Sequence, residues 1–247
     1  MHRFYLPPEE YKGGTLVLTC GEAHHALHVL RVRPKEQVTI LDGAGQEFLC
    51  EVQTKERAQV LLRILDRKVH PGPAWHITLC QGLPKGKIIE SIIQKATELG
   101  VSRIVPLLSE RVVADINEKT ARDKQAKWQT VAVEAIKQCG AAWLPQVCMP
   151  ATPGHFLANP ERAELALIAS LQLGSRHPRE YFNAFHQKHE RAPKSIQLWI
   201  GPEGDFAPGE IERIESGGAL PITLGPRVLR TETAATYCLS IVNYELQ

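Results

Sequence analysis

The sequence predicts an α/β protein of two domains, a small β-rich domain at residues 1–70 and a larger α/β domain at 76–247. The first part holds five short β-rich runs separated by Pro, Gly and charged turns. Val69–Trp75, a stretch rich in Pro and Gly, has the composition of a linker. Beyond it, buried strands alternate with amphipathic helices, which is typical of a domain with a mostly parallel sheet.

The β-rich runs of the first domain, with one helix between them, are typical of a small barrel with an inserted helix. The helix is expected at about Glu22–Leu30. The strands are expected at His2–Leu6, Thr15–Leu18, Gln37–Leu41, Glu47–Val52 and Gln59–Leu65.

The predicted helix and the residues after it form the only dense basic cluster of this half, with His24, His25, His28, Arg31 and Arg33. A solvated helix face, a metal site and an RNA contact all remain open. No carboxylate or Cys lies at a spacing that would complete a metal site, so metal is the least favoured. Contact of Arg31 and Arg33 with RNA phosphate is the sharper hypothesis.

In the second domain, apolar residues repeat at helical spacing in two segments, a third segment is an apolar run after a capping residue, and short apolar runs lie between them. Helices are expected at Lys85–Leu99, Glu118–Cys139 and Thr231–Leu246, with Thr231 as the N-cap of the last. Strands are expected at His76–Gly82, Arg103–Leu108, Leu165–Ala169, Ile196–Ile200 and Ile222–Leu224. Connection rules alone predict an unknotted, doubly wound sheet, because threaded chains are very rare.

Two of these strands run into glycine turns. Ile196–Ile200 is followed by Gly201-Pro202-Glu203-Gly204, and the later strand by Gly225-Pro226-Arg227. Backbone without a Cβ lets a ligand approach closely, and open α/β sheets bind small molecules at the carboxyl ends of their strands. Ordinary turns after strands would have the same composition. From these residues alone, a ligand site and two plain turns are equal alternatives.

Composition excludes few partners. The 247 residues are 43% apolar and 23% charged with a net charge of +2, as in a soluble globular protein without a strongly basic character. The six cysteines are scattered without a Cys-x-x-Cys pair, which favours reduced thiols and a cytoplasmic location. No apolar run reaches the roughly 20 residues that a membrane span needs.

Longer motifs carry a resemblance to a known family. The segments Ile200–Phe206 (IGPEGDF) and Leu224–Ala234 (LGPRVLRTETA) resemble the two signature loops of the 16S ribosomal RNA uridine-N3 methyltransferases. These enzymes belong to the SPOUT superfamily of knotted, S-adenosylmethionine-dependent methyltransferases. Gln81–Lys87 and Gln94–Val101 are also similar to that family, and His24–Arg33 is similar to its PUA-like RNA-binding domain. The resemblance runs nearly end to end.

The resemblance implies a C-terminal α/β trefoil-knot domain after a PUA-like barrel, with the last strand and helix passing through a loop. It also implies a cytoplasmic homodimer that packs through the C-terminal helix, modifies 16S ribosomal RNA of the small ribosomal subunit, and needs neither metal nor membrane. S-adenosylmethionine is the implied cofactor. Its expected contacts are Leu198, Ile200, Gly201, Pro202, Glu203, Gly204, Leu224, Gly225, Arg227, Val228, Leu229 and Thr231.

Two further sets of residues are candidates for RNA contact and for catalysis. Lys85 and Lys87 lie at a predicted helix N-terminus, where cations oppose the helix dipole; an anionic partner such as RNA and two solvated lysines are equal alternatives. Methyl transfer to N3 of uracil requires loss of the N3 proton. Arg230 is a candidate to lower the pKa of that proton or to bind phosphate, and Glu232 is a candidate general base. Glu232 would equally suit the first turn of a helix.

The sequence also departs from the family pattern. Ala141 stands where the family has Arg, Asp205 where Gly is usual, and Ala207 where Ser usually caps a helix. Two other functions stay open, and the absence of Arg at position 141 favours only the second of them. One is a knotted methyltransferase with another target, such as a ribose 2′-oxygen or a tRNA guanine. The other is an RNA-binding or assembly module without turnover.

Overall fold

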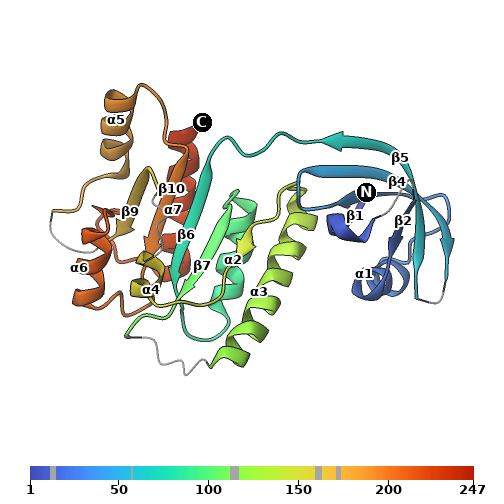
Figure 1. Cartoon of the computed structure of the whole chain (residues 1–247), viewed down its shortest axis with the longest axis horizontal. Coiled ribbons are helices and arrows are strands. Elements are labelled where there is room, and N and C mark those ends of the chain that lie inside the picture. Colours follow the sequence, from blue (N-terminus) through green and yellow to red (C-terminus); the bar gives the residue numbers. More distant parts are fainter. Residues whose placement is uncertain (12–14, 57, 112–116, 159–162, 171–173) are drawn as a thin grey trace. The chain divides into compact units, whose positions relative to one another are not determined.

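The computed structural model describes residues 1–11, 15–56, 58–111, 117–158, 163–170 and 174–247 (Figure 1). Its internal contacts define two compact units. The first comprises Met1–Pro73 and Val133–Leu144, and the second comprises Ala74–Ala132 and Pro145–Gln247. The domain limits expected from the sequence, 1–70 and 76–247, stay a prediction.

The first unit is built on a five-stranded sheet in the order β1-β3-β4-β5-β2. β1 runs parallel to β3, and the other neighbours are antiparallel. The strands are β1 (His2–Tyr5), β2 (Thr15–Leu18), β3 (Gln37–Leu41), β4 (Gln46–Lys55) and β5 (Val60–Val69). All five predicted strands are confirmed. β4 and β5 are longer than expected because their exposed ends still pair with each other.

Helical segments and the end of a later helix complete this unit. A short turn, η1 (Pro8–Glu10), precedes α1 (Cys20–His24), which continues into a π-helical turn, η2 (His25–Val29). Ala23 and Ala26 of this segment are buried against Phe4 and Phe48 of the sheet. The predicted inserted helix is therefore confirmed, with a π-helical second half.

The last turns of α3 (Glu118–Cys139) also belong to the first unit. The side chain of Lys137 is 5% exposed and pairs with Glu22 at 2.7 Å and Glu134 at 2.8 Å. Burial opposes the charge of Lys137, but the hydrogen bonds to Glu134 and Glu22 outweigh it and raise the pKa of the ammonium. This ion pair holds the end of α3 to α1.

The second unit is a six-stranded sheet in the order β11-β9-β10-β6-β7-β8, and every neighbouring pair is parallel. The strands are β6 (His76–Gly82), β7 (Arg103–Leu107), β8 (Gln146–Val147), β9 (Leu165–Ala169), β10 (Ser195–Ile200) and β11 (Leu220–Ile222). The parallel α/β domain is thus confirmed. β11 ends two residues earlier than expected, because its partner β9 pairs with it only as far as Ile222.

Helices cover both faces of this sheet (Figure 1). They are α2 (Ile88–Glu98), α4 (Pro153–Leu157), α5 (Pro178–His189), α6 (Pro208–Ser216) and α7 (Thr231–Leu246). Side chains of α4 and α6 pack on Trp199 and Cys80 of the sheet, while α2 and α7 pack on each other. The N-cap of α7 is Arg230, so the prediction of Thr231 as the cap is wrong. Thr231 is instead the first helical residue, because its hydroxyl is engaged in the site described below.

Candidate active site

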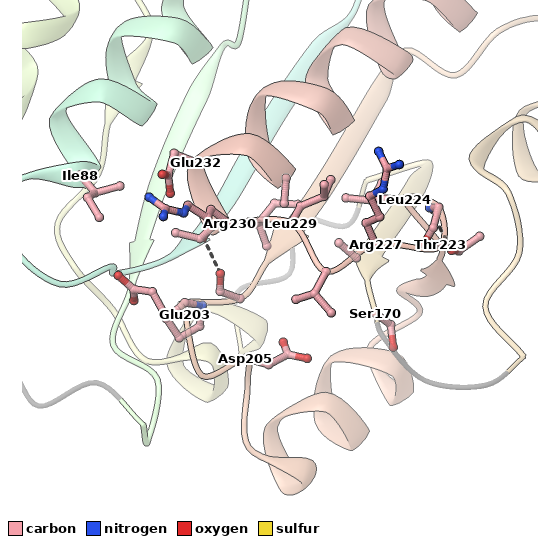
Figure 2. Close-up of a pocket in the computed structure, with 18 of the residues that line it drawn as sticks. Ile88, Ser170, Glu203, Asp205, Thr223, Leu224, Arg227, Leu229, Arg230 and Glu232 are labelled. Carbon is pink, nitrogen blue, oxygen red and sulfur yellow. Dashed lines mark hydrogen bonds between the residues drawn. The ribbon is translucent and has the colours of Figure 1, made fainter.

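A cavity of about 650 Å³ opens at the carboxyl ends of β9, β10 and β11, between the two glycine loops (Figure 2). This size is within the range of small-molecule sites. Most of the residues expected to bind cofactor line it: Ile200, Gly201, Pro202, Glu203, Leu224, Gly225, Arg227, Val228, Leu229 and Thr231. The catalytic candidates Arg230 and Glu232 line the same cavity.

The other two expected cofactor residues lie elsewhere. Leu198 is fully buried within β10, and Gly204 lines a neighbouring cavity. The cavity also has lining residues that the sequence analysis did not assign: Ile88, Ala169, Ser170, Asp205, Thr223, Pro226 and Ala234. Ala169 is the last residue of β9 and Ser170 follows it. β9 is the sheet neighbour of both β10 and β11, but no glycine turn marks this position.

The start of α7 is fastened to the first glycine loop by a buried hydroxyl. Thr231 Oγ1 donates to Gly201 O at 2.6 Å and accepts from Gln81 Nε2 at 2.9 Å. Both side chains are buried, and Gln81 Nε2 also donates to Gly82 O. The backbone of Gly82 also packs closely against Pro202 of the same loop. A Cβ at Gly82 would lie 2.5 Å from Pro202 Cδ and 2.6 Å from Pro202 N. Only glycine fits there.

A buried carboxylate fastens the other side of the same loop. Ala207 is the N-cap of α6 and has no capping oxygen, as expected. Glu210, 2% exposed, accepts from Ala207 N at 2.9 Å, from Ser109 Oγ at 2.9 Å and from Glu110 N at 3.0 Å. The loop after β7 is therefore joined to the loop after β10.

Asp205 occupies a left-handed backbone conformation, with φ at +59°. This explains why glycine suits the position, and aspartate tolerates it better than most residues. Its Oδ1 accepts from Phe206 N at 2.8 Å. Burial raises the pKa of the Asp205 carboxyl, although this hydrogen bond and the nearby Arg111 oppose the shift. The cavity wall thus holds a partly desolvated acid.

The second glycine loop offers free backbone groups to a ligand. Within the described part of the chain, the backbone N–H groups of Leu224, Val228 and Leu229 make no hydrogen bond. The side chains of Ile200 and Leu229 add apolar surface. Apolar walls with a few backbone donors match the adenosine part of S-adenosylmethionine, so the residues present fit this cofactor.

The charged side chains gather at one end of the cavity. In Figure 2, Arg230, Glu232 and Glu203 lie on the same side as Ile88, away from Arg227 and Ser170. Arg230 precedes α7 and Glu232 lies in its first turn. Glu203 accepts a hydrogen bond from Lys85 N at 3.0 Å. A cation and two carboxylates therefore lie together at one end of the cavity.

The four expected RNA-binding residues are all exposed and belong to different units. Arg31 and Arg33 follow η2 in the first unit, and Lys85 and Lys87 precede α2 in the second. His24 and His28 lie with their ring centroids 4.8 Å apart. No helix in the described residues is long and apolar enough to cross a membrane.

Comparison with known proteins identifies both parts of the chain. Residues 70–243 match the RNA methyltransferase domain family, and residues 18–65 match the RNA methyltransferase PUA domain family. Relatives are named ribosomal RNA small subunit methyltransferase E. The protein from Synechocystis is 34% identical, covering 100% of this chain and 78% of the relative. The protein from Bacillus subtilis is 29% identical, covering 94% and 91%.

Solved structures agree with the family matches. A methyltransferase from Legionella pneumophila in complex with bound S-adenosylmethionine superposes with a TM-score of 0.87 at 33% identity, covering 98% of this chain and 96% of that one. The small subunit methyltransferase E from Neisseria gonorrhoeae, also bound to S-adenosylmethionine, gives 0.84 at 29% identity, covering 99% and 97%. The fold class and the family expected from the sequence are confirmed: the chain belongs to the RNA methyltransferase family that includes ribosomal RNA small subunit methyltransferase E.

Proposed function

We propose that this protein transfers a methyl group from S-adenosylmethionine to N3 of a uridine in 16S ribosomal RNA, in the cytoplasm, during maturation of the small ribosomal subunit. The observation that carries the proposal is the cavity built from both glycine loops, with Arg230 and Glu232 in its wall. Relatives named for small subunit ribosomal RNA, and structural relatives with bound S-adenosylmethionine, support it.

The chain's own residues would hold the cofactor through backbone and apolar contacts. The free N–H groups of Leu224, Val228 and Leu229 would donate to the adenine edge, and Ile200 would pack on its face. S-adenosylmethionine supplies a methyl group activated on a sulfonium. The fixed loop at Gly201 would align the donor with the acceptor nitrogen, because such displacements require an in-line approach.

Arg230 and Glu232 would act on the acceptor. Loss of the N3 proton leaves negative charge on uracil. The guanidinium of Arg230 would stabilise this charge, and the carboxylate of Glu232 would take the proton. Their positions before and within the first turn of α7 hold both side chains at the same end of the cavity (Figure 2). Lys85 and Lys87, with Arg31 and Arg33 in the first unit, would contact RNA phosphates.

We also propose that two copies associate through α7. Large apolar side chains on and near this helix are exposed: Val228 is 77% exposed, Tyr244 70% and Tyr237 46%. Exposed apolar residues grouped on one element are typical of an interface, and twofold dimers are the commonest symmetric assembly. Sedimentation of the purified protein tests this; a monomer at micromolar concentration would contradict it.

The experiment for the main proposal combines calorimetry with nucleoside mass spectrometry. Wild type should bind S-adenosylmethionine and yield N3-methyluridine in unmodified small-subunit RNA. Gly201→Val should abolish binding, because a Cβ at Gly201 collides with Asp205. Arg230→Ala and Glu232→Gln should keep cofactor affinity and lose about 100-fold or more in rate. Glu212→Gln, an exposed substitution on α6, is the control.

Failure would take one of two forms. No cofactor binding, with or without RNA, would overturn the methyltransferase assignment and favour an RNA-binding module. A product methylated on a ribose oxygen or on guanine would keep the enzyme class and overturn the uridine-N3 assignment.

A further inference from the structure

A second cavity, of about 770 Å³, adjoins the cofactor site. It lies between the loop after β6, the loop after β7 and α3, and all of its lining residues belong to the second unit. Pro202 and Glu203 line both cavities. A ligand in the second cavity therefore lies next to the cofactor cavity, separated from it by the loop that holds Pro202 and Glu203.

The walls of the second cavity carry net positive charge. Lys85, Arg111 and Lys124 supply three cations against the single carboxylate of Glu203. Among the residues that the structure describes, no carboxylate lies within salt-bridge distance of these three cations. A recess lined by charge of one sign concentrates counter-ions, so the ligand class is anionic.

Lys124 differs from its neighbours on α3. Arg122 pairs with Glu118, and Lys127 pairs with Glu90 at 2.6 Å. Lys124 is partly buried at the cavity wall and has no such partner in the described chain. An ammonium group without an ion pair at the cavity wall is available to an anionic ligand.

An aromatic side chain completes the cavity. Trp128 is 4% exposed, and its indole N–H has no hydrogen-bond partner in the described part of the protein. Indoles at such positions normally bond through this group. Trp128 thus offers the cavity a single hydrogen-bond donor rather than an exposed ring face, and one donor beside three cations matches the phosphate and polar edge of a nucleotide.

We propose that this second cavity binds the acceptor RNA strand beside the target uridine, with a phosphodiester held by Lys85 and Lys124 and with the indole N–H of Trp128 donating a hydrogen bond to the strand. The proposal rests on the proposed function. N3 lies on the Watson–Crick edge of uracil, so the target must be unpaired when it meets the donor. A strand anchored in the second cavity presents its next nucleotide across Glu203, at the end of the cofactor cavity where Arg230 and Glu232 lie (Figure 2).

The test compares Lys124→Ala with Lys119→Ala, which removes the same charge from an exposed position on the same helix, outside the cavity. Binding of a short oligouridylate is measured by fluorescence anisotropy over a range of salt, cofactor binding by calorimetry, and methylation with unmodified small-subunit RNA. Lys124→Ala should weaken oligouridylate binding by about tenfold and lower the salt slope by roughly 0.7, the share of one phosphate. It should raise KM for RNA and leave cofactor affinity unchanged.

The outcomes separate this proposal from the proposed function. Equal RNA affinity and KM for Lys124→Ala and Lys119→Ala, in a protein whose wild type binds cofactor and methylates RNA, would overturn the second site alone. Wild type that binds no cofactor and methylates no RNA would overturn the function. Inorganic phosphate that competes as well as oligouridylate at equal phosphate concentration would show a free-anion site, and would also overturn the assignment to RNA.

Discussion

Replacing Thr231 with valine tests whether one hydroxyl holds the cofactor site together. Valine has nearly the same shape, so the change removes two hydrogen bonds, to Gly201 O and from Gln81 Nε2, without opening a cavity. At about 0.5–1.5 kcal/mol each, their loss should lower the free energy of unfolding by about 1–3 kcal/mol. Gly201 O would lose its hydrogen-bond partner at the rim of the cavity, so the loop would be held less firmly around the cofactor. Each 1.4 kcal/mol by which this change destabilises the cofactor complex more than the free protein lowers the affinity about tenfold.

The assays are urea unfolding and calorimetric titration with S-adenosylmethionine, and the matched control is Thr231→Ser, which keeps the hydroxyl. Thr231→Val should be less stable and bind cofactor more weakly than Thr231→Ser. If the two variants have the same urea midpoint and the same dissociation constant, the hydroxyl has no fastening role, and the argument from its two hydrogen bonds is refuted.

Three further predictions follow from buried or paired carboxylates. In Glu210→Gln, an amide NH₂ group replaces an acceptor oxygen and faces one of the three groups that donate hydrogen bonds to Glu210. Urea unfolding should show a free energy of unfolding that is lower by about 2–3 kcal/mol. The raised pKa of the Asp205 carboxyl means that its ionisation destabilises the folded state as the pH rises. The Asp205→Asn variant lacks this ionisation, so its urea midpoint should exceed that of wild type at pH 7 and equal it at low pH. Glu164, hydrogen-bonded to Arg191 and to Lys194 N, has its pKa lowered to about 2, so it stabilises the fold above its ordinary pKa of 4.5 and less as pH falls toward 2. Glu164→Gln should flatten the pH dependence of unfolding in that window; an unchanged profile would contradict it.

Many regular elements were predictable from their apolar patterns, although α2 begins at Ile88 and not at the predicted Lys85. The 22 residues of α3 and the 16 of α7 have the bounds that the sequence predicts, as do β2, β3, β6 and β9. β8 and α4 were not predicted, because two and five residues are too short to show a period. α5 was missed although it has 12 residues, because only Phe182 and Phe185 mark its buried face besides the initial proline.

The loops of the site were predictable from the sequence, but the long-range hydrogen bonds that hold these loops in place were not. Glycine turns after strands, with the family resemblance, pointed to residues that line the cavity, including Gly201 and Gly225. The bond from Thr231 to Gln81 joins residues 150 positions apart, and that from Ser109 to Glu210 joins residues 101 apart. Such pairings depend on how the sheet orders its strands, and a single sequence carries no local pattern for them.

The shared loop couples the affinities of the two cavities for their ligands. Pro202 and Glu203 line both the cofactor cavity and the proposed RNA cavity, and their loop is fixed from one side by Thr231 and from the other by Glu210. A ligand that shifts this loop in one cavity changes the wall of the other. Linkage then requires the effect to be reciprocal: if RNA tightens cofactor binding, cofactor must tighten RNA binding by the same factor. Removing the hydrogen bonds on either side, by Thr231→Val or Glu210→Gln, should reduce that common factor, because the coupling depends on a loop that is held as one rigid segment.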